Sequence, residues 1–338
     1  MKKWMCILLV IMLVSLTLGA CAQQTDIGKE TTGKGDTDQS TTVTNDSEGS
    51  NEGSNTDLPG NDTTDDEDQN EAETDSDYDK IMTDASVSSA DILVYISDNG
   101  EKLSTEQAIN IVLKLEQLQT AGLPAMTDRY FEEDQRDLLT DKVYDFNSGE
   151  IQMDSVKSEG FRKVLEEAQS NGYKTETAEG SFFPVIDYSI YTKFSAILPE
   201  DLSSYFSLMA VESGNKPASD GGLVIGWDEV FSRALAQEQF IVKYGKSQKL
   251  NEVKELYSKY VNFIFDGSSL PNAEHFSYDT KTLEPRLKES LIKAAEKYGD
   301  SILEKTISEY LEVLKKNNFK LTAEVKQFRE NTVTALSK

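Results

Sequence analysis

Side chains that commonly do chemistry are scarce in this chain of 338 residues. It has a single histidine, His275, and two cysteines, Cys6 and Cys21. A catalytic triad needs a nucleophile beside the histidine, and the sequence has no Gly-x-Ser-x-Gly turn to present a serine. A typical zinc site needs several histidines or cysteines. We therefore predict no cofactor and no metal, and we expect His275, in the loop 271–276, to be a surface or half-buried structural residue.

Acids beside aromatic residues are the other candidates for catalysis. Asp187 lies next to aromatic residues, Asp228 and Glu229 follow Trp227, and Glu212 ends a segment that contains two aromatic residues. Two carboxyl groups on either side of a groove that stacks a sugar ring could hydrolyse a glycan. Acids are equally typical of the first turn of a helix. Paired catalytic carboxylates are therefore an alternative prediction, because spacing alone does not bring these residues together.

The first twenty-one residues have the pattern of a targeting signal. Two lysines precede an apolar run, 4–18, of about 15 residues, and the run leads into Leu18-Gly19-Ala20-Cys21. This pattern resembles the signal and lipobox of bacterial lipoproteins, in which the chain is cleaved before the cysteine and its sulfur receives a lipid. The resemblance implies that Cys21 carries a lipid that includes palmitate. It also implies that the protein lies on the extracytoplasmic face of the cell membrane. A cleaved secretory signal and an uncleaved helix are the alternatives, although a spanning helix needs roughly 20 residues.

Charge is distributed unevenly along the chain. The net charge of −26 divides into +2 for 1–21, −15 for 22–80 and −13 for 81–338. Residues 22–80 are mostly Ser, Thr, Asn, Gly, Asp and Glu, with few apolar side chains, so we predict a disordered acidic linker. So negative a chain should be repelled by nucleic acid and by anionic headgroups. We therefore expect no nucleic-acid partner, and membrane contact through the lipid on Cys21.

The remaining residues, 81–338, are predicted to form a mainly helical extracytoplasmic domain. The β-branched run 91–96 suggests a strand. Ser104 and Gln107 have the spacing of a capping box, and the helix behind them should end at Gly122 and Pro124. We expect a second helix or helix pair over 130–146.

A third helix should end at Asn171-Gly172, and a β-hairpin should follow. Its strands are 173–177 and 182–186, and Pro184 makes the second an edge strand. A sub-boundary of the domain near 172–187 is also predicted. After Asp187 the chain should be helical nearly to its end, with one helix beginning near Pro199.

Two turns of similar sequence, 243–247 and 297–301, lie 54 residues apart. In each we expect a glycine in a left-handed C-cap and a serine that caps the next helix, Ser247 or Ser301. The stretch 226–315 resembles the helix-turn-helix units of tetratricopeptide-like proteins, which implies a solenoid, although the spacing differs from a 34-residue repeat. The predicted fold is therefore mainly α, an irregular helical-hairpin bundle or a short solenoid with one small β-hairpin.

These observations predict a membrane-anchored surface lipoprotein without enzymatic activity. Its helical domain would bind an envelope protein or peptide in a groove between hairpins. One alternative is a cell-wall hydrolase that uses paired carboxylates. Another is a solute-binding transport lipoprotein, which would need many βαβ units that the sequence does not suggest.

Overall fold

The structure is a computed structural model, and it describes residues 76–146, 148–297, 299 and 301–337. The chain divides into 1–61 and 62–338, and all described residues belong to the second unit. The predicted signal, Cys21 and the linker up to residue 75 lie outside the described residues.

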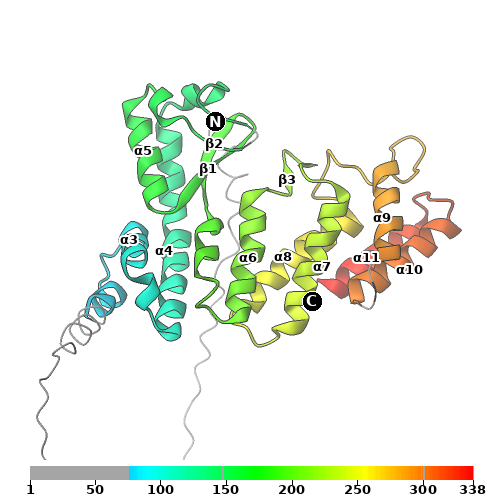
Figure 1. Ribbon diagram of the computed structural model, residues 1–338. Coiled ribbons are helices and arrows are strands. Elements are labelled where there is room, and N and C mark those ends of the chain that lie inside the picture. The colour runs from blue at the N-terminus through cyan, green and yellow to red at the C-terminus, as the bar shows by residue number, and fades with distance from the viewer. Residues whose placement is uncertain (1–75, 147, 298, 300, 338) are drawn as a thin grey trace, which may run out of the picture. The chain divides into compact units, whose positions relative to one another are not determined.

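The described residues are mainly α-helical, as predicted (Figure 1). Residues 76–83 form a first helical segment. The other α-helices are α3 (Ser89–Asn99), α4 (Thr105–Glu132), α5 (Glu159–Ser170), α6 (Glu200–Gly214), α7 (Trp227–Lys243), α8 (Leu250–Val261), α9 (Pro285–Lys297), α10 (Ile302–Lys316) and α11 (Ala323–Leu336). The short helices are η1 (Gly100–Lys102), η2 (Gln135–Leu139), η3 (Met153–Ser155), η4 (Tyr188–Phe194) and η5 (Asn262–Asp266), the last a π-helix. No helix within these described ranges combines the length and the apolar composition required to cross a bilayer.

The predicted strand at 91–96 is wrong, because this run lies inside α3. Ser88 caps the helix: its hydroxyl accepts a hydrogen bond from the Asp91 backbone N–H at 3.2 Å, and Asp91 Oδ2 accepts from the Ser88 N–H at 2.9 Å. Ile92 and Ile96 are buried while Val94 is 61% exposed. The apolar residues therefore follow helical spacing, and the reciprocal cap outweighs the strand preference of β-branched residues.

The capping box at the start of α4 is confirmed, but the predicted end at Gly122 and Pro124 is wrong. Gln107 N–H donates to the Ser104 hydroxyl at 3.2 Å, and Ser104 N–H donates to Gln107 Oε1 at 2.9 Å. The helix then continues past Pro124 to Glu132. Pro124 is exposed, and the residues beyond it pack inward, with Tyr130 fully buried. Tertiary packing thus overrides the helix-breaking preference of proline.

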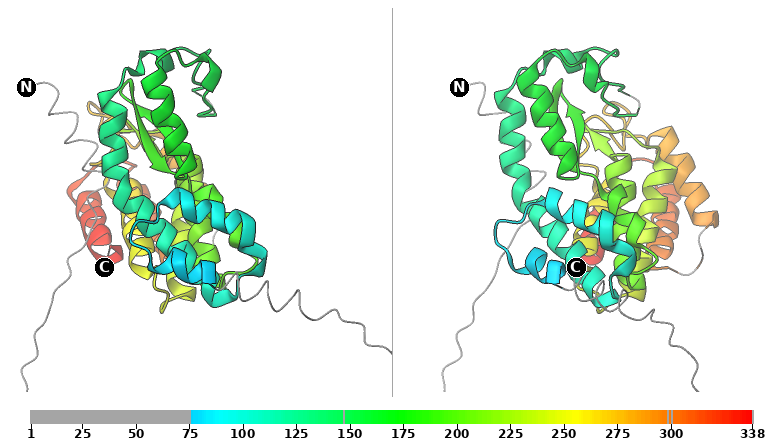
Figure 2. Two further views of the ribbon diagram at one scale, coloured as in Figure 1. Left: turned by 90° about the vertical axis from the view of Figure 1, so that its left-hand side faces the viewer. Right: turned by 60° about the vertical axis from the view of Figure 1, so that its left-hand side comes forward.

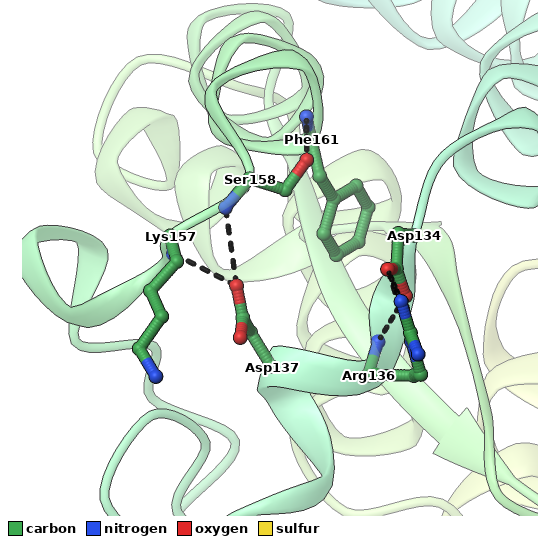
Figure 3. Close-up of polar contacts among 6 residues, drawn as sticks. All are labelled: Asp134, Arg136, Asp137, Lys157, Ser158 and Phe161. Atoms are coloured by element: carbon green, nitrogen blue, oxygen red, sulfur yellow. Dashed lines mark hydrogen bonds and ion pairs between the residues drawn. The ribbon is translucent and has the colours of Figure 1, made fainter.

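The predicted helix or helix pair at 130–146 is also wrong. Beyond Glu132 the chain forms only the short helix η2, and Tyr144 then makes an isolated antiparallel bridge with Ile151. Figure 3 shows how the start of this segment is held by its own side chains. Asp134 accepts two hydrogen bonds from Arg136 Nε, at 2.8 and 2.9 Å.

Asp137 connects η2 to the beginning of α5 (Figure 3). Its Oδ2 accepts hydrogen bonds from the backbone N–H groups of Lys157, at 2.8 Å, and Ser158, at 3.1 Å. The Ser158 hydroxyl in turn caps α5 by accepting from the Phe161 N–H at 3.2 Å. A carboxylate near a helix N-terminus is stabilised by the helix dipole, which explains why an irregular segment can be fixed here.

The predicted β-hairpin is confirmed. Strands β1 (Tyr173–Ala178) and β2 (Ser181–Ile186) pair antiparallel, with Tyr173 opposite Ile186. The two turn residues, Glu179 and Gly180, both have positive φ, as a tight hairpin requires. Helices α4 and α5 pack against the hairpin (Figure 2). A second pairing joins two short strands, β3 (Ala218–Ser219) and β4 (Gly222–Leu223).

Two hydrophobic cores organise the described residues. The first is built from α3 to α6 with the β1–β2 hairpin, and the second from α7 to α11 with η5. Helices α7 and α8 contribute to both cores: Phe240 and Val253 pack in the first, whereas Phe231 and Tyr257 pack in the second. These two helices therefore join the cores.

The two similar turns are built differently, contrary to the prediction. After α7, Gly245 does not have a left-handed backbone, and Lys249 rather than Ser247 occupies the N-cap position of α8. Before α10, Ser301 does cap the helix and forms a capping box with Glu304, as predicted. Neither Gly245 nor Gly299 has a left-handed backbone, so the shared sequence gives one of the two expected serine caps and neither expected glycine cap.

Candidate functional site

Three of the four acids that the sequence singled out, Asp187, Asp228 and Glu212, contact different partners. The Asp187 carboxylate accepts a hydrogen bond from the Ser189 backbone N–H at 3.0 Å, at the start of η4. Asp228, in the first turn of α7, lies 3.5 Å from Lys293 Nζ in an exposed ion pair. Glu212, near the end of α6, instead contacts α7 and α8. None of these contacts joins one of the three acids to another.

Glu212 and Glu229 do meet, and the group that joins them is Arg233. Arg233 Nε donates to Glu229 Oε1 at 2.9 Å, and its Nη1 lies 3.3 Å from Glu212 Oε1. Nη1 also donates to the Asn215 carbonyl oxygen at 2.9 Å, and the Tyr260 hydroxyl donates to Glu212 Oε1 at 2.5 Å. Arg233 is only 6% exposed. Helices α6, α7 and α8 thus converge on one buried guanidinium.

In this arrangement Arg233 stays charged, which does not suit proton transfer. Burial alone would lower the pKa of Arg233, but the hydrogen bonds to Glu229 and Tyr260 and the charge of Glu212 raise it above its ordinary value. Burial also raises the pKa of Tyr260, and the neighbouring Glu212 raises it further. A guanidinium that stays charged is a fixed positive charge beside the two carboxylates. The cluster is therefore suited to binding and less suited to general acid catalysis.

A small groove lies over this cluster, between α6 and α7. Its volume is about 170 Å³. Its lining residues are Leu208, Val211 and Glu212 from α6, and Glu229, Ser232, Arg233, Ala236 and Gln237 from α7. Val211, at its edge, is 45% exposed. Small-molecule pockets are typically about 300–1,000 Å³, so this groove has room for one inserted side chain rather than a whole substrate.

A wider depression lies beside the turn that follows α7. Its volume is about 680 Å³, and it is lined by Glu200, Asp201 and residues 243–247. Its lining residues are mostly charged or polar in type and none of them is buried, and Lys243 forms an exposed ion pair with Glu200. Without a buried apolar anchor it lacks the feature that usually supplies most of the affinity at an interface. We therefore take the α6–α7 groove as the candidate site.

The sequence suggested that His275 lies at the surface or is half-buried. This prediction is wrong, because the residue is buried in the second core. It is 4% exposed, and its ring contacts the Trp227 ring edge-on at 5.3 Å between centroids. His275 Nε2 lies 2.8 Å from the Phe263 carbonyl oxygen, so Nε2 carries the proton and donates. Burial lowers the pKa of His275 to about 4, and the nearby charge of Arg329 acts in the same direction. The described contacts of its ring are with the Trp227 ring and the Phe263 carbonyl oxygen.

One buried polar cluster was missed by the sequence analysis. Glu116, on the core face of α4, is 5% exposed, and its Oε1 accepts hydrogen bonds from the hydroxyls of Tyr205, at 2.6 Å, and Tyr188, at 3.0 Å. Lys249 Nζ lies 2.6 Å from Glu116 Oε2, in an ion pair whose geometry falls short of a hydrogen bond. Burial and the charge of Glu116 both contribute to raising the pKa of Tyr188. A sequence signal did exist, because Glu116 lies four residues after the core residue Val112.

The described ranges contain no group of three or more His, Cys, Asp or Glu side chains placed to hold a metal ion. No protein-family model matches the chain, and neither a curated protein nor a solved structure matches it.

Proposed function

We propose that the protein is a lipid-anchored surface lipoprotein on the extracytoplasmic face of a cell membrane. The support is the register of the first twenty-one residues, in which a basic start, an apolar run and Leu18-Gly19-Ala20-Cys21 follow one another. The lipid is carried by Cys21. The acidic stretch that follows separates the anchor from the helical domain.

The helical domain binds an envelope protein or peptide in the α6–α7 groove. The observation that carries this part is the groove itself, an apolar edge at Val211 above a buried charge cluster centred on Arg233. A groove between two helices that combines apolar and charged groups suits an inserted side chain of a peptide or helix. The net charge of the protein argues against nucleic acid as the partner. The weak similarity of 226–315 to tetratricopeptide-like hairpins is consistent with a peptide-binding role.

Photocrosslinking in intact cells tests the groove. A photoreactive amino acid replaces Val211, and in a matched control it replaces Val242, which is 74% exposed on α7 and does not line the groove. We expect the Val211 probe, but not the Val242 probe, to yield a discrete adduct with another protein. Adding Ala236→Arg, which fills the groove, should abolish the adduct. Equal adducts from both positions, or none from Val211, would contradict the proposed site.

Mass spectrometry of the membrane fraction tests the anchor. We expect the wild-type protein to begin at Cys21 and to carry the mass of a lipid on that residue. The Cys21→Ser variant should lack the lipid and retain the first twenty residues. An unmodified Cys21 in wild-type membranes would disprove the anchor without affecting the groove.

A further inference from the structure

A lysine-rich face forms where the turn after residue 276 meets the end of α10. The Leu283 N–H donates to the Phe319 carbonyl oxygen at 2.8 Å, and the Leu321 N–H donates to the Lys281 carbonyl oxygen at 2.8 Å. Between these bonds, residue 282 makes an antiparallel bridge with residue 320. This pairing places Thr282 opposite Lys320 and Lys281 opposite Leu321, so the two lysines lie on adjacent backbone segments although they are distant in the sequence.

Two aromatic rings complete the face. Lys281 Nζ lies 4.5 Å from the centroid of the Tyr278 ring, and Lys288 Nζ lies 3.8 Å from that of the Phe319 ring. Tyr278 is 77% exposed. We define the lysine face by these residues: Tyr278, Lys281, Lys288, Phe319 and Lys320.

The lysines of this face are not neutralised by carboxylates. Ion pairs involve the neighbouring Lys293, Lys315 and Lys316, but within the described residues none involves Lys281, Lys288 or Lys320. The carboxylate of the nearby Glu284 is engaged elsewhere: it accepts a hydrogen bond from the Leu287 N–H at 2.7 Å. Asp279 is the other acid on this turn, and it is exposed. The face therefore offers three ammonium groups to an external anion.

The backbone of the face is unusual as well. Among the described residues, five that are not glycine have positive φ, and three of them lie here: Lys281 at 55°, Asn318 at 51° and Phe319 at 55°. This conformation is uncommon for residues with long or bulky side chains. Strained residues persist only where the surrounding structure fixes them, and they gather at binding sites more often than elsewhere.

The distribution of charge along the chain indicates which segment binds to the lysine face. Residues 227–338 contain 17 acids and 18 Lys or Arg, so this part carries +1, whereas 81–226, with 25 acids and 11 Lys or Arg, carries −14. The densest acidic run is Asp62-Thr63-Thr64-Asp65-Asp66-Glu67-Asp68, which has five acids in seven residues. We propose that the lysine face binds the acidic run 62–68 of a second copy of this chain.

The second copy is favoured over the same molecule by chain length. Asp68 lies eight residues before Ser76, and eight residues span at most about 28 Å. The described part begins next to α3, which packs on α4 and α5, while α9 and α10 pack on each other and α9 also on α7. The described start of the chain thus packs in the first core, through Tyr78, whereas the lysine face lies on the second, so a second copy is the favoured occupant. A protein or peptide anion suits the face better than a glycan, because ammonium groups already cover the two rings.

Carbodiimide crosslinking of the full-length protein tests the contact, because this reagent joins carboxylates to amines that touch. Equal amounts of ¹⁴N- and ¹⁵N-labelled protein are mixed, crosslinked and digested. We expect mixed-label crosslinks between the run 62–68 and Lys281, Lys288 or Lys320. Their yield should fall about fivefold or more between about 0.01 M and 1 M salt, because screening of exposed charges shortens from about 30 Å to about 3 Å.

Two matched pairs of variants give the controls. The triple variant K281Q/K288Q/K320Q should lose these crosslinks, while K254Q/K305Q/K326Q, which removes three exposed lysines from α8, α10 and α11, should keep its crosslinks to the lysine face. Neutralising the five acids of 62–68 should also abolish the crosslinks to the lysine face. Neutralising five earlier acids should leave these crosslinks in place; the five are Asp26, Glu30, Asp36, Asp38 and Asp46. Crosslinks only between residues of one label would overturn the second copy as the occupant. Equal loss in both lysine variants, or no crosslink to the face, would overturn the site.

Discussion

The two regions joined by α7 and α8 differ in how they use charge. The region 81–226 carries −14, yet its core contains a carboxylate, Glu116, that is buried and bound by two tyrosines. The region 227–338 carries +1, and its core is aliphatic and aromatic, with the Tyr310 ring 5.5 Å from the rings of Phe265 and Phe328 between centroids. Both regions thus enclose a charge, but the first buries a carboxylate bound by tyrosine hydroxyls, and the second buries the guanidinium of Arg233, bound by carboxylates and a carbonyl oxygen.

The comparison also shows where the two regions depend on each other. Lys249, at the start of α8, reaches across to Glu116 on α4, and its side chain is only 14% exposed. Lys249 also lies over the Tyr205 ring, 5.0 Å from its centroid. An ion pair between two buried groups contributes little net stability, but each partner is costly to leave alone. The contact therefore makes the first core sensitive to a residue of α8.

The largest expected effect comes from removing the buried carboxylate. Glu116→Ala should lower the free energy of unfolding by about 3–5 kcal/mol, because Lys249 and two tyrosine hydroxyls lose their partner in a buried site. Urea unfolding followed by circular dichroism measures the change. Glu252→Ala is the matched control, because Glu252 pairs with the same lysine at 3.3 Å but is 44% exposed. It should cost less than about 1 kcal/mol. Similar losses in both variants would show that burial does not separate the two pairs.

The same region is where sequence patterns predicted structure least well. The run 91–96 has strand-like residues, and the Ser88–Asp91 capping box together with the packing of its buried side chains on α4 and α5 makes it a helix. The predictions made at Pro124 and at 130–146 are wrong for a related reason, because contacts with β1 and β2 decide where α4 ends. Tyr173 donates to the Gln119 carbonyl oxygen at 2.6 Å, before the proline, and Tyr130 bonds Thr175 at 2.9 Å, after it. Such distant contacts leave no local signal.

Local signals, by contrast, predicted the caps at Ser104 and Ser301 and the β1–β2 hairpin. Ser104, Ser301 and the turn Glu179-Gly180 each fix their structure through neighbours in the sequence. The site was only partly predictable. Glu212 and Glu229 were found as acids beside aromatic residues, but Arg233, which joins them, is an ordinary helix residue until α6 packs beside it.

The second core should respond to pH through His275. Its pKa of about 4 lies below the ordinary value of 6.5, so the folded protein binds the proton less well than the unfolded chain. The stability from neutral His275 is complete above pH 6.5 and is lost as the pH falls towards 4. The loss should be about 3 kcal/mol over this window.

Unfolding measured between pH 7 and pH 4 tests this contribution. The His275→Gln variant is the comparison, because it cannot titrate in this window. Carboxylates titrate in both proteins, so the difference between the two pH curves isolates the histidine. Parallel curves would show that His275 does not sense pH in the folded protein.

Replacing Pro124 sharpens the account of α4 in the first region. Pro124→Ala should raise the free energy of unfolding by about 1–3 kcal/mol, because alanine restores a helical hydrogen bond and removes the ring from the preceding turn. The site is exposed, so the substitution removes little packing. Thr127→Ala, in the same turn but without a change of backbone donor, is a suitable control. A loss of stability on removing the proline would mean that a bend at this position is required for α4 to pack on the hairpin.

The smallest expected effect tests whether the two regions are energetically independent. Ser104 caps α4 in the first region, and Ser301 caps α10 in the second, each in a reciprocal box with the residue three positions on. Ser104→Ala and Ser301→Ala should each cost about 1 kcal/mol, because each leaves a backbone N–H without its acceptor. The helices α4 and α10 lie in different cores, so the double variant should lose the sum of the two within about 0.5 kcal/mol. A larger departure from additivity, measured by urea unfolding, would show that coupling through α7 and α8 extends beyond the Glu116–Lys249 contact and reaches the ends of distant helices.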